Sequence, residues 1–267
     1  TQEHYYDLAS VYFQQQKYEE AIKALDKFEK YVGINEEIIK QKQQLYLKLN
    51  KINDAIAEGV KLMEAYPDEP RYVVNQIELL ITNEKFDEAE KLCEQLLKKD
   101  AHNPYAHLML SEIYRAKGDL KRSNEKLKQA FANRELEIDV KLGILIGKVR
   151  QLPNKEIQEQ CLELGDILVK SHPTDSKAYA MNADILVIAG ESKEALDQYI
   201  KSIRIDNSHF KIWQQIAILD YELNQIDSLR IHTDQALELF PNQSVLWFYN
   251  GLAHHLQKKY KKATVSL

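Results

Sequence analysis

Residue types that catalyse reactions or bind phosphate occur in this sequence, but not in the patterns that such chemistry needs. Gly143 and Gly147-Lys148 come near the spacing of a phosphate-binding loop, yet three residues separate the glycines where four are required. Val149 follows the lysine at the place where Ser or Thr must hold the metal ion. These residues also stand in an apolar helical stretch, whereas such a loop joins a strand to a helix. We therefore exclude a phosphate-binding loop.

Metal-binding and nucleophilic patterns are missing from the sequence as well. None of the eight histidines belongs to a His-Glu-x-x-His motif or to an i, i+4 pair supported by a carboxylate. Cys93 and Cys161 are too far apart for a zinc site and fall on apolar helical faces, where free Cys behaves as a small hydrophobe. Paired carboxylates such as Glu19-Glu20 stand at expected helix starts and favour the helix dipole. The sequence predicts no catalytic residue, no metal and no cofactor.

Composition favours a helical protein with a sizeable core. Of the 267 residues, 44% are hydrophobic and 29% charged, and only 8 are Gly and 6 Pro. The net charge of −5 comes without a basic stripe, which argues against a nucleic-acid partner. No run of about 18 apolar residues predicts a membrane span. Because the chain opens with Thr and stops inside an expected helix, we read it as a soluble piece of a longer cytoplasmic or periplasmic protein.

A small residue that recurs about every 34 positions is the strongest pattern in the chain. The intervals between successive occurrences are 34, 34, 34, 38, 34, 34 and 34 residues. The positions are Ala21, Ala55, Ala89, Ser123, Cys161, Ala195, Leu229 and Ala263, which we call the small positions. A small side chain lets the backbones of two crossing helices approach closely. The period therefore predicts a series of helical hairpins with one small position at each crossing.

Turn and cap residues divide the expected helices at the same period. Asn103-Pro104 and Pro173-Thr174-Asp175 fall between hairpins, where Pro in the first turn and Asn or Asp before it are helix-start signals. Gly118 and Gly190 fall inside hairpins, where Gly accepts the left-handed conformation that ends a helix. These turn and cap residues thus predict two helices in each repeat.

The aromatic and small residues together resemble the tetratricopeptide repeat family. The residues that carry this resemblance are Trp247, Gly251, Tyr260 and Ala263, with Trp213, Ala217 and Pro241. The resemblance implies an all-α fold, a right-handed α-α superhelix of about eight helix-turn-helix repeats that form one solenoid over 1–267. The repeats are expected at 2–35, 36–69, 70–103, 104–137, 138–175, 176–209, 210–243 and, truncated, 244–267.

Two repeats depart from the family pattern. The second has Lys42-Gln43 where the consensus has Leu-Gly. The fifth has four extra residues, and we expect one upstream of its first helix and three in an enlarged turn at 151–154, because Pro153 cannot continue a helix. The same register places Gly143 and Gly147 on the concave side of that helix, although a register error of one residue moves both away from it.

The resemblance implies that the first helices of the repeats line a concave groove for an extended peptide or a helix of a partner protein. The expected groove residues are Lys40, Gln44, Arg71, Asn75, Glu78, Glu112, Arg115, Arg150 and Asp184. We therefore predict a non-catalytic scaffold for protein–protein interaction. The set of Lys and Asn residues by which one branch of the family clamps chaperone tails is incomplete here.

Two other functions stay open at this point. The chain is the helical arm of a larger enzyme or of a cell-envelope assembly or secretion machine, whose active part lies outside 1–267. Alternatively, it is a peptide-sensing regulator, a class that often has an N-terminal DNA-binding helix-turn-helix, which is not seen here. The sequence names neither the partner nor the pathway.

Overall fold

The computed structural model describes residues 3–266, and every regular element in that range is an α-helix. The helices are α1 (Glu3–Gln14), α2 (Tyr18–Val32), α3 (Glu36–Lys48), α4 (Ile52–Ala65), α5 (Pro70–Thr82), α6 (Phe86–Lys99), α7 (Pro104–Ala116), α8 (Leu120–Ala132), α9 (Ile138–Val149), α10 (Lys155–Ser171), α11 (Ser176–Ala189), α12 (Ser192–Ile205), α13 (Phe210–Glu222), α14 (Ile226–Leu239), α15 (Ser244–Leu256) and α16 (Tyr260–Ser266). The fold is all-α, as the sequence predicts.

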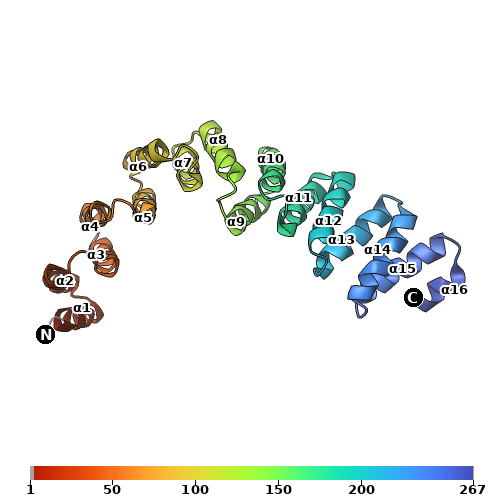
Figure 1. Ribbon diagram of the computed structural model, residues 1–267, viewed down its shortest axis with the longest axis horizontal. Helices are drawn as coiled ribbons and strands as arrows, with labels where there is room; N and C mark the ends of the chain where they lie inside the picture. The colour runs from red at the N-terminus through yellow and green to blue at the C-terminus, as the bar shows by residue number, and fades with distance from the viewer. Residues whose placement is uncertain (1–2, 267) are drawn as a thin grey trace. The chain divides into compact units, whose positions relative to one another are not determined.

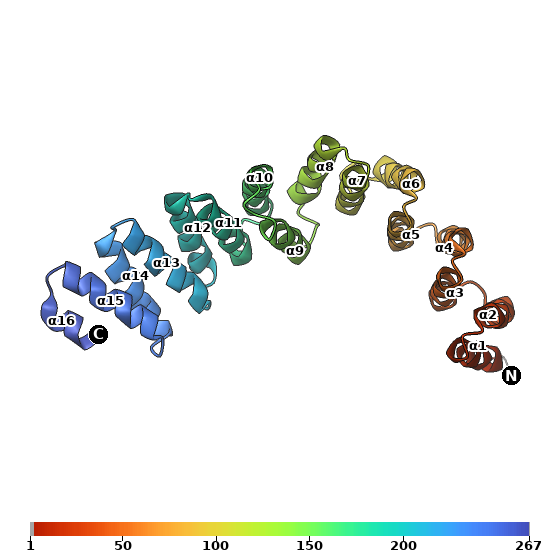
Figure 2. The same ribbon diagram turned by 180° about the vertical axis from the view of Figure 1, so that it is seen from behind.

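The chain divides into two compact units, residues 1–130 and 131–267. Inside each unit a helix packs against the next one along the chain, and α5 also contacts α7, α9 contacts α11, and α13 contacts α15. Both ribbon views show the outcome: α1, α3 and α5 form one layer of the first unit and α2, α4 and α6 the other, and α9–α14 alternate in the same way in the second (Figures 1 and 2). We call the odd-numbered helices first helices and the even-numbered ones second helices.

The small positions lie where the two helices of each hairpin meet. All eight are buried, with exposed fractions of 0–5%. Leu229, the largest of them, is fully buried and packs with Ala217 of the facing first helix and with Ala253. In that hairpin the small residue at the contact is Ala217 of the first helix. The period of 34 is confirmed as a contact that closes each hairpin.

Each unit builds its core as a series of clusters between neighbouring hairpins. One cluster holds Ile77, Cys93 and Ile113, another in the first unit holds Ala21 and Leu25, and a third holds Ala183, Leu196 and Ile216. Because each cluster draws only on adjacent hairpins, stability in such a fold is a sum of local terms.

A left-handed residue ends the first helix in seven hairpins. Positive φ angles between 55° and 83° occur at Gln16, Asn50, Glu84, Gly118, Gly190, Asn224 and Lys258. Apart from the fifth hairpin, which has none, these residues are also 34 positions apart. The sequence revealed only the two glycines. Gln16, Glu84 and Lys258 are residue types that rarely adopt this conformation, whereas Asn, as at Asn50 and Asn224, adopts it more often.

Side chains cap the N-termini of several helices as predicted. Asn103 Oδ1 accepts a hydrogen bond from Ala106 N at 2.9 Å, ahead of Pro104 in the first turn of α7. Asp175 Oδ1 accepts from Lys177 N at 2.9 Å at the start of α11. Such caps satisfy backbone donors that have no partner inside the helix.

The fifth hairpin differs from the expected one. Its turn, 150–154, has five residues where the turn at 117–119 has three. The rest of the insertion lengthens α10, which begins at Lys155, six residues before its small position, whereas α8 begins only three residues before Ser123. The reason is local: Pro153 ends the turn, and Asn154 Oδ1 accepts a hydrogen bond from Ile157 N at 3.1 Å and so starts the helix there.

Candidate partner-binding face

All nine predicted groove residues lie on or directly after first helices, and all are exposed. They are Lys40 and Gln44 on α3, Arg71, Asn75 and Glu78 on α5, Glu112 and Arg115 on α7, Arg150 after α9, and Asp184 on α11. Repeats two to six thus supply these side chains, seven of them in the first unit and two in the second.

In the first unit, Glu36 engages two of the predicted cations. Lys40 Nζ lies 2.7 Å from Glu36 Oε1, and Arg71 Nη1 lies 3.2 Å from Glu36 Oε2. The hydrogen bond from Lys40 holds the pKa of the Glu36 carboxyl below its usual value. Tyr72 joins the cluster, because Arg71 stacks on its ring and donates a hydrogen bond to its hydroxyl at 2.8 Å. Lys40 and Arg71 are therefore positioned side chains on one network.

A cavity of about 250 Å³ opens near the N-terminal end of the first unit. Phe13 from α1, Leu25 from α2 and Leu45 from α3 give it apolar walls, and Gln41 and Gln44 line its polar side. Gln44 is the one predicted groove residue that lines it. The amide groups of such residues donate and accept hydrogen bonds, which an extended backbone can complete.

The second unit has two cavities on the face formed by α9, α11 and α13. One, of about 360 Å³, is lined by Val149 and Arg150, by Val187 and Ile188 of α11, and by Gln215 of α13 among others. We call it the upper cavity. The second, of about 310 Å³, reaches toward the N-terminal ends of α11 and α13, and we call it the lower cavity.

The two cavities of the second unit meet at α11, because Met181 and Asp184 line both. The structure therefore brings Arg150 and Asp184 to one site. Gly143 and Gly147 line neither cavity; both are exposed, and a Cβ atom on either would meet nothing within 4 Å. Their lack of side chains does not shape this face.

Asp184 is an acid in apolar surroundings. Its side chain is open to the cavities but crowded on its other sides, and this burial raises the pKa of its carboxyl. The buried Tyr199 of α12 donates a hydrogen bond to Asp184 Oδ1, which opposes that rise. Asp184 is thus a fixed negative group at the centre of a mainly apolar face.

Buried polar residues form a row on the first helices, and of this row only Lys42 was noted from the sequence. One position per first helix is occupied by Leu8, Lys42, Gln76, Leu110, Leu145, Asn182, Ile216 and Asn250. The four polar residues at this position contact the second helix of the hairpin before their own. Lys42, Gln76, Asn182 and Asn250 are 1–3% exposed. The 34-residue period contained this signal, since polar residues replace Leu at a position that the family fills with Leu.

Each buried polar residue of this row has partners in neighbouring helices. Lys42 Nζ lies 2.7 Å from Asp26 Oδ1, 2.7 Å from Glu29 Oε2 and 2.9 Å from Glu58 Oε1. Burial alone lowers the pKa of Lys42, but hydrogen bonds to the three carboxylates outweigh it and raise the pKa above its ordinary value. Gln76 Nε2 donates to Ile56 O at 2.9 Å.

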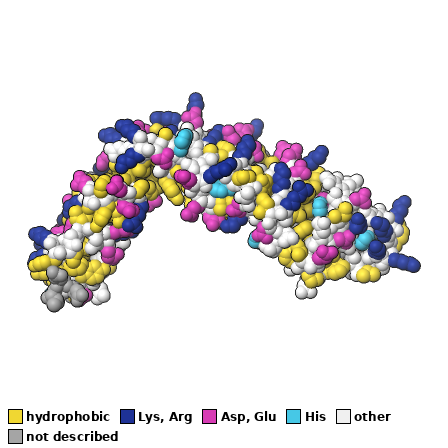
Figure 3. All heavy atoms as spheres, in the orientation of Figure 1, with side chains coloured by type: hydrophobic (Ala, Val, Ile, Leu, Met, Phe, Trp, Pro, Cys, Tyr) yellow, Lys and Arg dark blue, Asp and Glu magenta, His cyan; other side chains and the backbone are white. Residues whose placement is uncertain are grey.

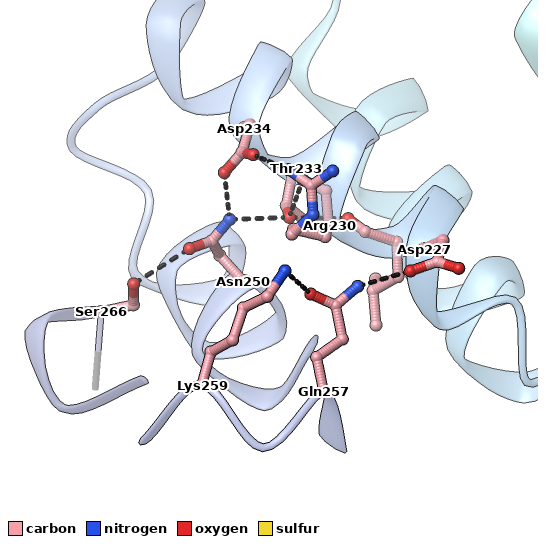
Figure 4. Close-up of polar contacts among 9 residues, drawn as sticks. Asp227, Arg230, Thr233, Asp234, Asn250, Gln257, Lys259 and Ser266 are labelled. Carbon is pink, nitrogen blue, oxygen red and sulfur yellow. Dashed lines mark hydrogen bonds and ion pairs between the residues drawn. The ribbon is translucent and has the colours of Figure 1, made fainter. Parts of the chain in front are cut away.

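Asn250 is held from three directions (Figure 4). Its Nδ2 donates to Thr233 Oγ1 at 3.0 Å and to Asp234 Oδ1 at 2.7 Å, both on α14. Ser266 of α16 donates from Oγ to Asn250 Oδ1 at 2.9 Å. These contacts join three consecutive helices, so the buried amide has a packing role.

Lys141 is the second fully buried lysine, and its partners are neutral. Its Nζ donates to Phe131 O at 2.8 Å, to Asn133 O at 2.7 Å and to Ser171 Oγ at 3.0 Å, and it lies 2.8 Å from His172 Nε2. Burial lowers the pKa of Lys141 to about 8. A lysine of lowered pKa can act as a nucleophile, but Lys141 is 0% exposed and closes the end of α8 instead.

Metal and thiol chemistry find no support in residues 3–266. No three His, Cys, Asp or Glu side chains gather there as a metal ion requires. Cys93 and Cys161 are fully buried, and burial raises the pKa of the Cys93 thiol to about 12. None of the described helices is long and apolar enough to cross a membrane. On the face seen in Figure 3, acidic, basic and hydrophobic side chains are interspersed over both units.

Successive helical hairpins, each closed by a buried small position, define a helical repeat protein. Residues 80–134 match the tetratricopeptide repeat family. The 34-residue period of the chain is also the repeat length of that family.

Individual relatives are distant. Anaphase-promoting complex subunit 3 of Schizosaccharomyces pombe is 26% identical over 104 residues, which are 39% of this chain and 16% of that protein. A tetratricopeptide repeat protein of Parabacteroides merdae ATCC 43184 has a solved structure with 12% identity and a TM-score of 0.42, covering 94% of this chain and 98% of its own. YrrB, a tetratricopeptide repeat protein with an unusual peptide-binding site, has 12% identity and a TM-score of 0.40, covering 78% and 88%.

Proposed function

We propose that this chain is a non-catalytic scaffold that binds a segment of a partner protein on its first helices. The adjoining cavities on α9, α11 and α13 carry the proposal, because both are mainly apolar, include a few polar groups and share Met181 and Asp184 in their walls. Pockets of this composition bind ligands by apolar contact and orient them by their polar groups. Proteins of this repeat family act in general as scaffolds for protein partners.

The nine predicted groove residues belong to the same proposal. The exposed Arg71, Glu112 and Arg115 of the first unit offer charges of both signs to a partner. Such charges select a partner and guide its approach more than they add affinity. The amide-lined cavity at α1 and α3 offers a separate place for an extended segment.

The groups whose pKa values are strongly shifted, Lys42, Lys141 and Cys93, support a scaffold over an enzyme. Lys42 and Lys141 have their hydrogen bonds directed to neighbouring helices. Cys93 lies inside an apolar cluster. A nucleophile or general base has to reach a substrate, and these groups face packed helices.

Affinity capture from a lysate of the source cells, followed by mass spectrometry, tests the proposal. Ala180 is half-buried and lines the lower cavity, so the Trp side chain of Ala180→Trp fills this cavity and replaces none of the fully buried residues. The matched control is Ala57→Trp, at an exposed position of α4. The proposal expects partners that the wild type and the Ala57→Trp control retain and Ala180→Trp loses. Equal capture by all three proteins contradicts a binding role for this face.

A charge-reversed variant tests the first unit separately. In Arg71→Glu, Glu112→Lys, Arg115→Glu, the three exposed charges change sign while the cavities of the second unit stay intact. Loss of a partner that Ala180→Trp retains would assign that partner to the first unit. Unchanged capture counts against these three residues.

A role as the arm of a larger assembly is the second candidate. The relative from S. pombe is by name a subunit of a complex, and the match spans 16% of its length. An arm of this kind uses the same faces toward a subunit of its own assembly. Co-purification of a stable stoichiometric subunit with the wild-type chain distinguishes it from a scaffold with exchangeable partners.

A further inference from the structure

The cavities of the second unit combine apolar walls with one central carboxylate. Leu142 and Ile212 give the lower cavity apolar surface, and Val187 and Ile188 give it to the upper cavity. Asp184 lies at the junction of the two. A segment that fills both cavities with apolar side chains must therefore pass over this carboxylate.

Arg150 lines the upper cavity and Lys211 the lower one, but among the described residues no Lys, Arg or His forms an ion pair with Asp184. Two of the basic side chains of the lower cavity have acidic partners of their own, Lys177 with Asp139 at 2.8 Å and His209 with Asp206 at 3.2 Å. Within the part of the chain that the structure describes, Asp184 makes one hydrogen bond, which Tyr199 donates. A partner that covers the cavities with apolar atoms alone would remove water from this carboxylate and leave it unpaired, which is unfavourable. A partner that brings a cation avoids that penalty.

The length of the site sets the size of the segment. The lining residues of α11 extend from Ser176 in the lower cavity to Ile188 in the upper one. Twelve residues of helix rise about 18 Å. An extended chain covers this distance in about five or six residues. Because side chains of an extended segment alternate, those at i−2, i and i+2 face the same wall.

From this geometry we infer that the second unit binds an extended segment in which Lys or Arg faces Asp184 and apolar side chains two positions before and after it enter the two cavities. This inference rests on the proposed function and specifies the partner for one of its faces. The selected pattern is apolar-x-basic-x-apolar. The basic residue gives the pattern its specificity, and the apolar residues give contact area.

A defined peptide set tests the inference. The core is apolar-Ser-Lys-Ser-apolar, with Leu, Ile, Met, Phe or Val at each apolar position and a fluorescent label beyond a Gly-Ser spacer. A second set carries acetyl-lysine at the centre, which keeps the length and removes the charge. Fluorescence anisotropy measures binding of both sets to the wild-type chain, to Asp184→Asn and to Ala180→Trp. The charge control is Asp197→Asn, at an exposed site on α12 outside both cavities.

We expect the best lysine peptides to bind the wild type about tenfold more tightly than their acetyl-lysine counterparts. Asp184→Asn removes this preference and Asp197→Asn retains it. Ala180→Trp weakens both sets. Equal binding of the two sets to the wild type, or a lysine preference that survives in Asp184→Asn, overturns the inference. So does a complete lack of binding by the lysine set.

Failure of the inference and failure of the proposed function give different results. If lysine and acetyl-lysine peptides bind equally and Ala180→Trp abolishes both, the face binds peptides and the basic preference is wrong. If Ala180→Trp changes neither peptide binding nor capture of cellular partners, the face itself is wrong. In Asp184→Asn the hydrogen-bond acceptor for Tyr199 is preserved, so loss of folding does not explain its effect.

Discussion

The backbone of Gly59 is covered by the side-chain amide of Gln76, so that a Cβ atom on Gly59 would lie 1.9 Å from Gln76 Oε1. Gly165 and Asn182 repeat this contact 106 positions later along the chain, where a Cβ atom would lie 2.4 Å from Asn182 Oδ1. In both cases the residue of the second helix is a glycine, and a buried amide of the next first helix occupies the space that a side chain there would fill. The glycine and the amide are therefore one packing unit.

Replacing these glycines by Ala should be destabilising, although Ala favours helix. Gly59→Ala displaces Gln76 from its hydrogen bond with Ile56 O, and we expect a loss of about 1–2 kcal/mol in the free energy of unfolding. Gly143→Ala is the matched control, because Gly143 is helical with open space at its Cβ, and should stabilise by about 0.5–1 kcal/mol. Urea denaturation measures both. A stabilising Gly59→Ala would show that Gln76 moves aside without cost.

Lys42 forms a cluster with Asp26, Glu29 and Glu58, and removing Lys42 alone should lower the free energy of unfolding. Lys42→Met leaves Glu58, whose side chain is 5% exposed, without the lysine that bridges it to Asp26 and Glu29. Breaking a buried ion pair costs about 3–5 kcal/mol, and because Glu58 keeps Lys61 at 2.8 Å we expect a loss at or below this range. The double variant Lys42→Met, Glu58→Gln should lose less than the sum of the single losses. Hydrogen exchange of the α2–α4 amides measures the effect locally, and additive losses would contradict a coupled cluster.

The buried Lys141 should make stability depend on pH. Burial lowers its pKa from 10.5 to about 8, so between these values the unfolded chain binds one more proton at this residue than the folded chain. Stability then rises with pH across this window, by up to about 1.4 kcal/mol per pH unit. Lys141→Met lacks this contribution. The melting temperature of the wild type minus that of the variant should increase from pH 7 to pH 10. A constant difference would mean that the ammonium keeps its proton in the folded chain.

The left-handed turn residues should accept glycine with a gain in stability. Glu84 has a φ of 60°, a conformation that disfavours residues with a Cβ atom. Glu84→Gly should stabilise by about 0.5–1 kcal/mol, and Gly118→Ala, at the equivalent turn one repeat later, should destabilise by about 1 kcal/mol. Thermal denaturation of both variants checks the pair. If both changes shift the melting temperature in the same direction, turn geometry is not the cause.

The sequence predicted the fold because one packing rule repeats along the chain. The small positions such as Ala21 and Ala195 mark hairpin crossings by residue type alone, and their burial confirms them. Turns at Gln16 and Glu84 were hidden, since ordinary residues adopt the left-handed conformation there. The turn of the fifth repeat was expected at 151–154 and spans 150–154, and the rest of the insertion lengthens α10, because Asn154 starts that helix earlier than the period indicates.

The sequence predicted less of the site than of the fold. Periodicity placed Arg150 and Asp184 on exposed faces of first helices, and the structure shows that they line one cavity. Periodicity did not show that Tyr199 of a second helix orients Asp184, because this depends on one side-chain contact inside the sixth hairpin. It also did not show that the cavities are apolar, because their walls come from several hairpins. Whether the nine predicted groove residues contact a partner stays a prediction.

Site-specific cross-linking tests the central claim most directly. A photoreactive benzophenone residue replaces Met181, which lines both cavities of the second unit, and, as the control, Asp197 on the exposed side of α12. After irradiation in the source cells, the account predicts cross-linked partner polypeptides from position 181 and none of the same partners from position 197. Cross-links from position 197 alone, or equal cross-links to the same partners from both positions, would contradict a partner-binding face on the first helices.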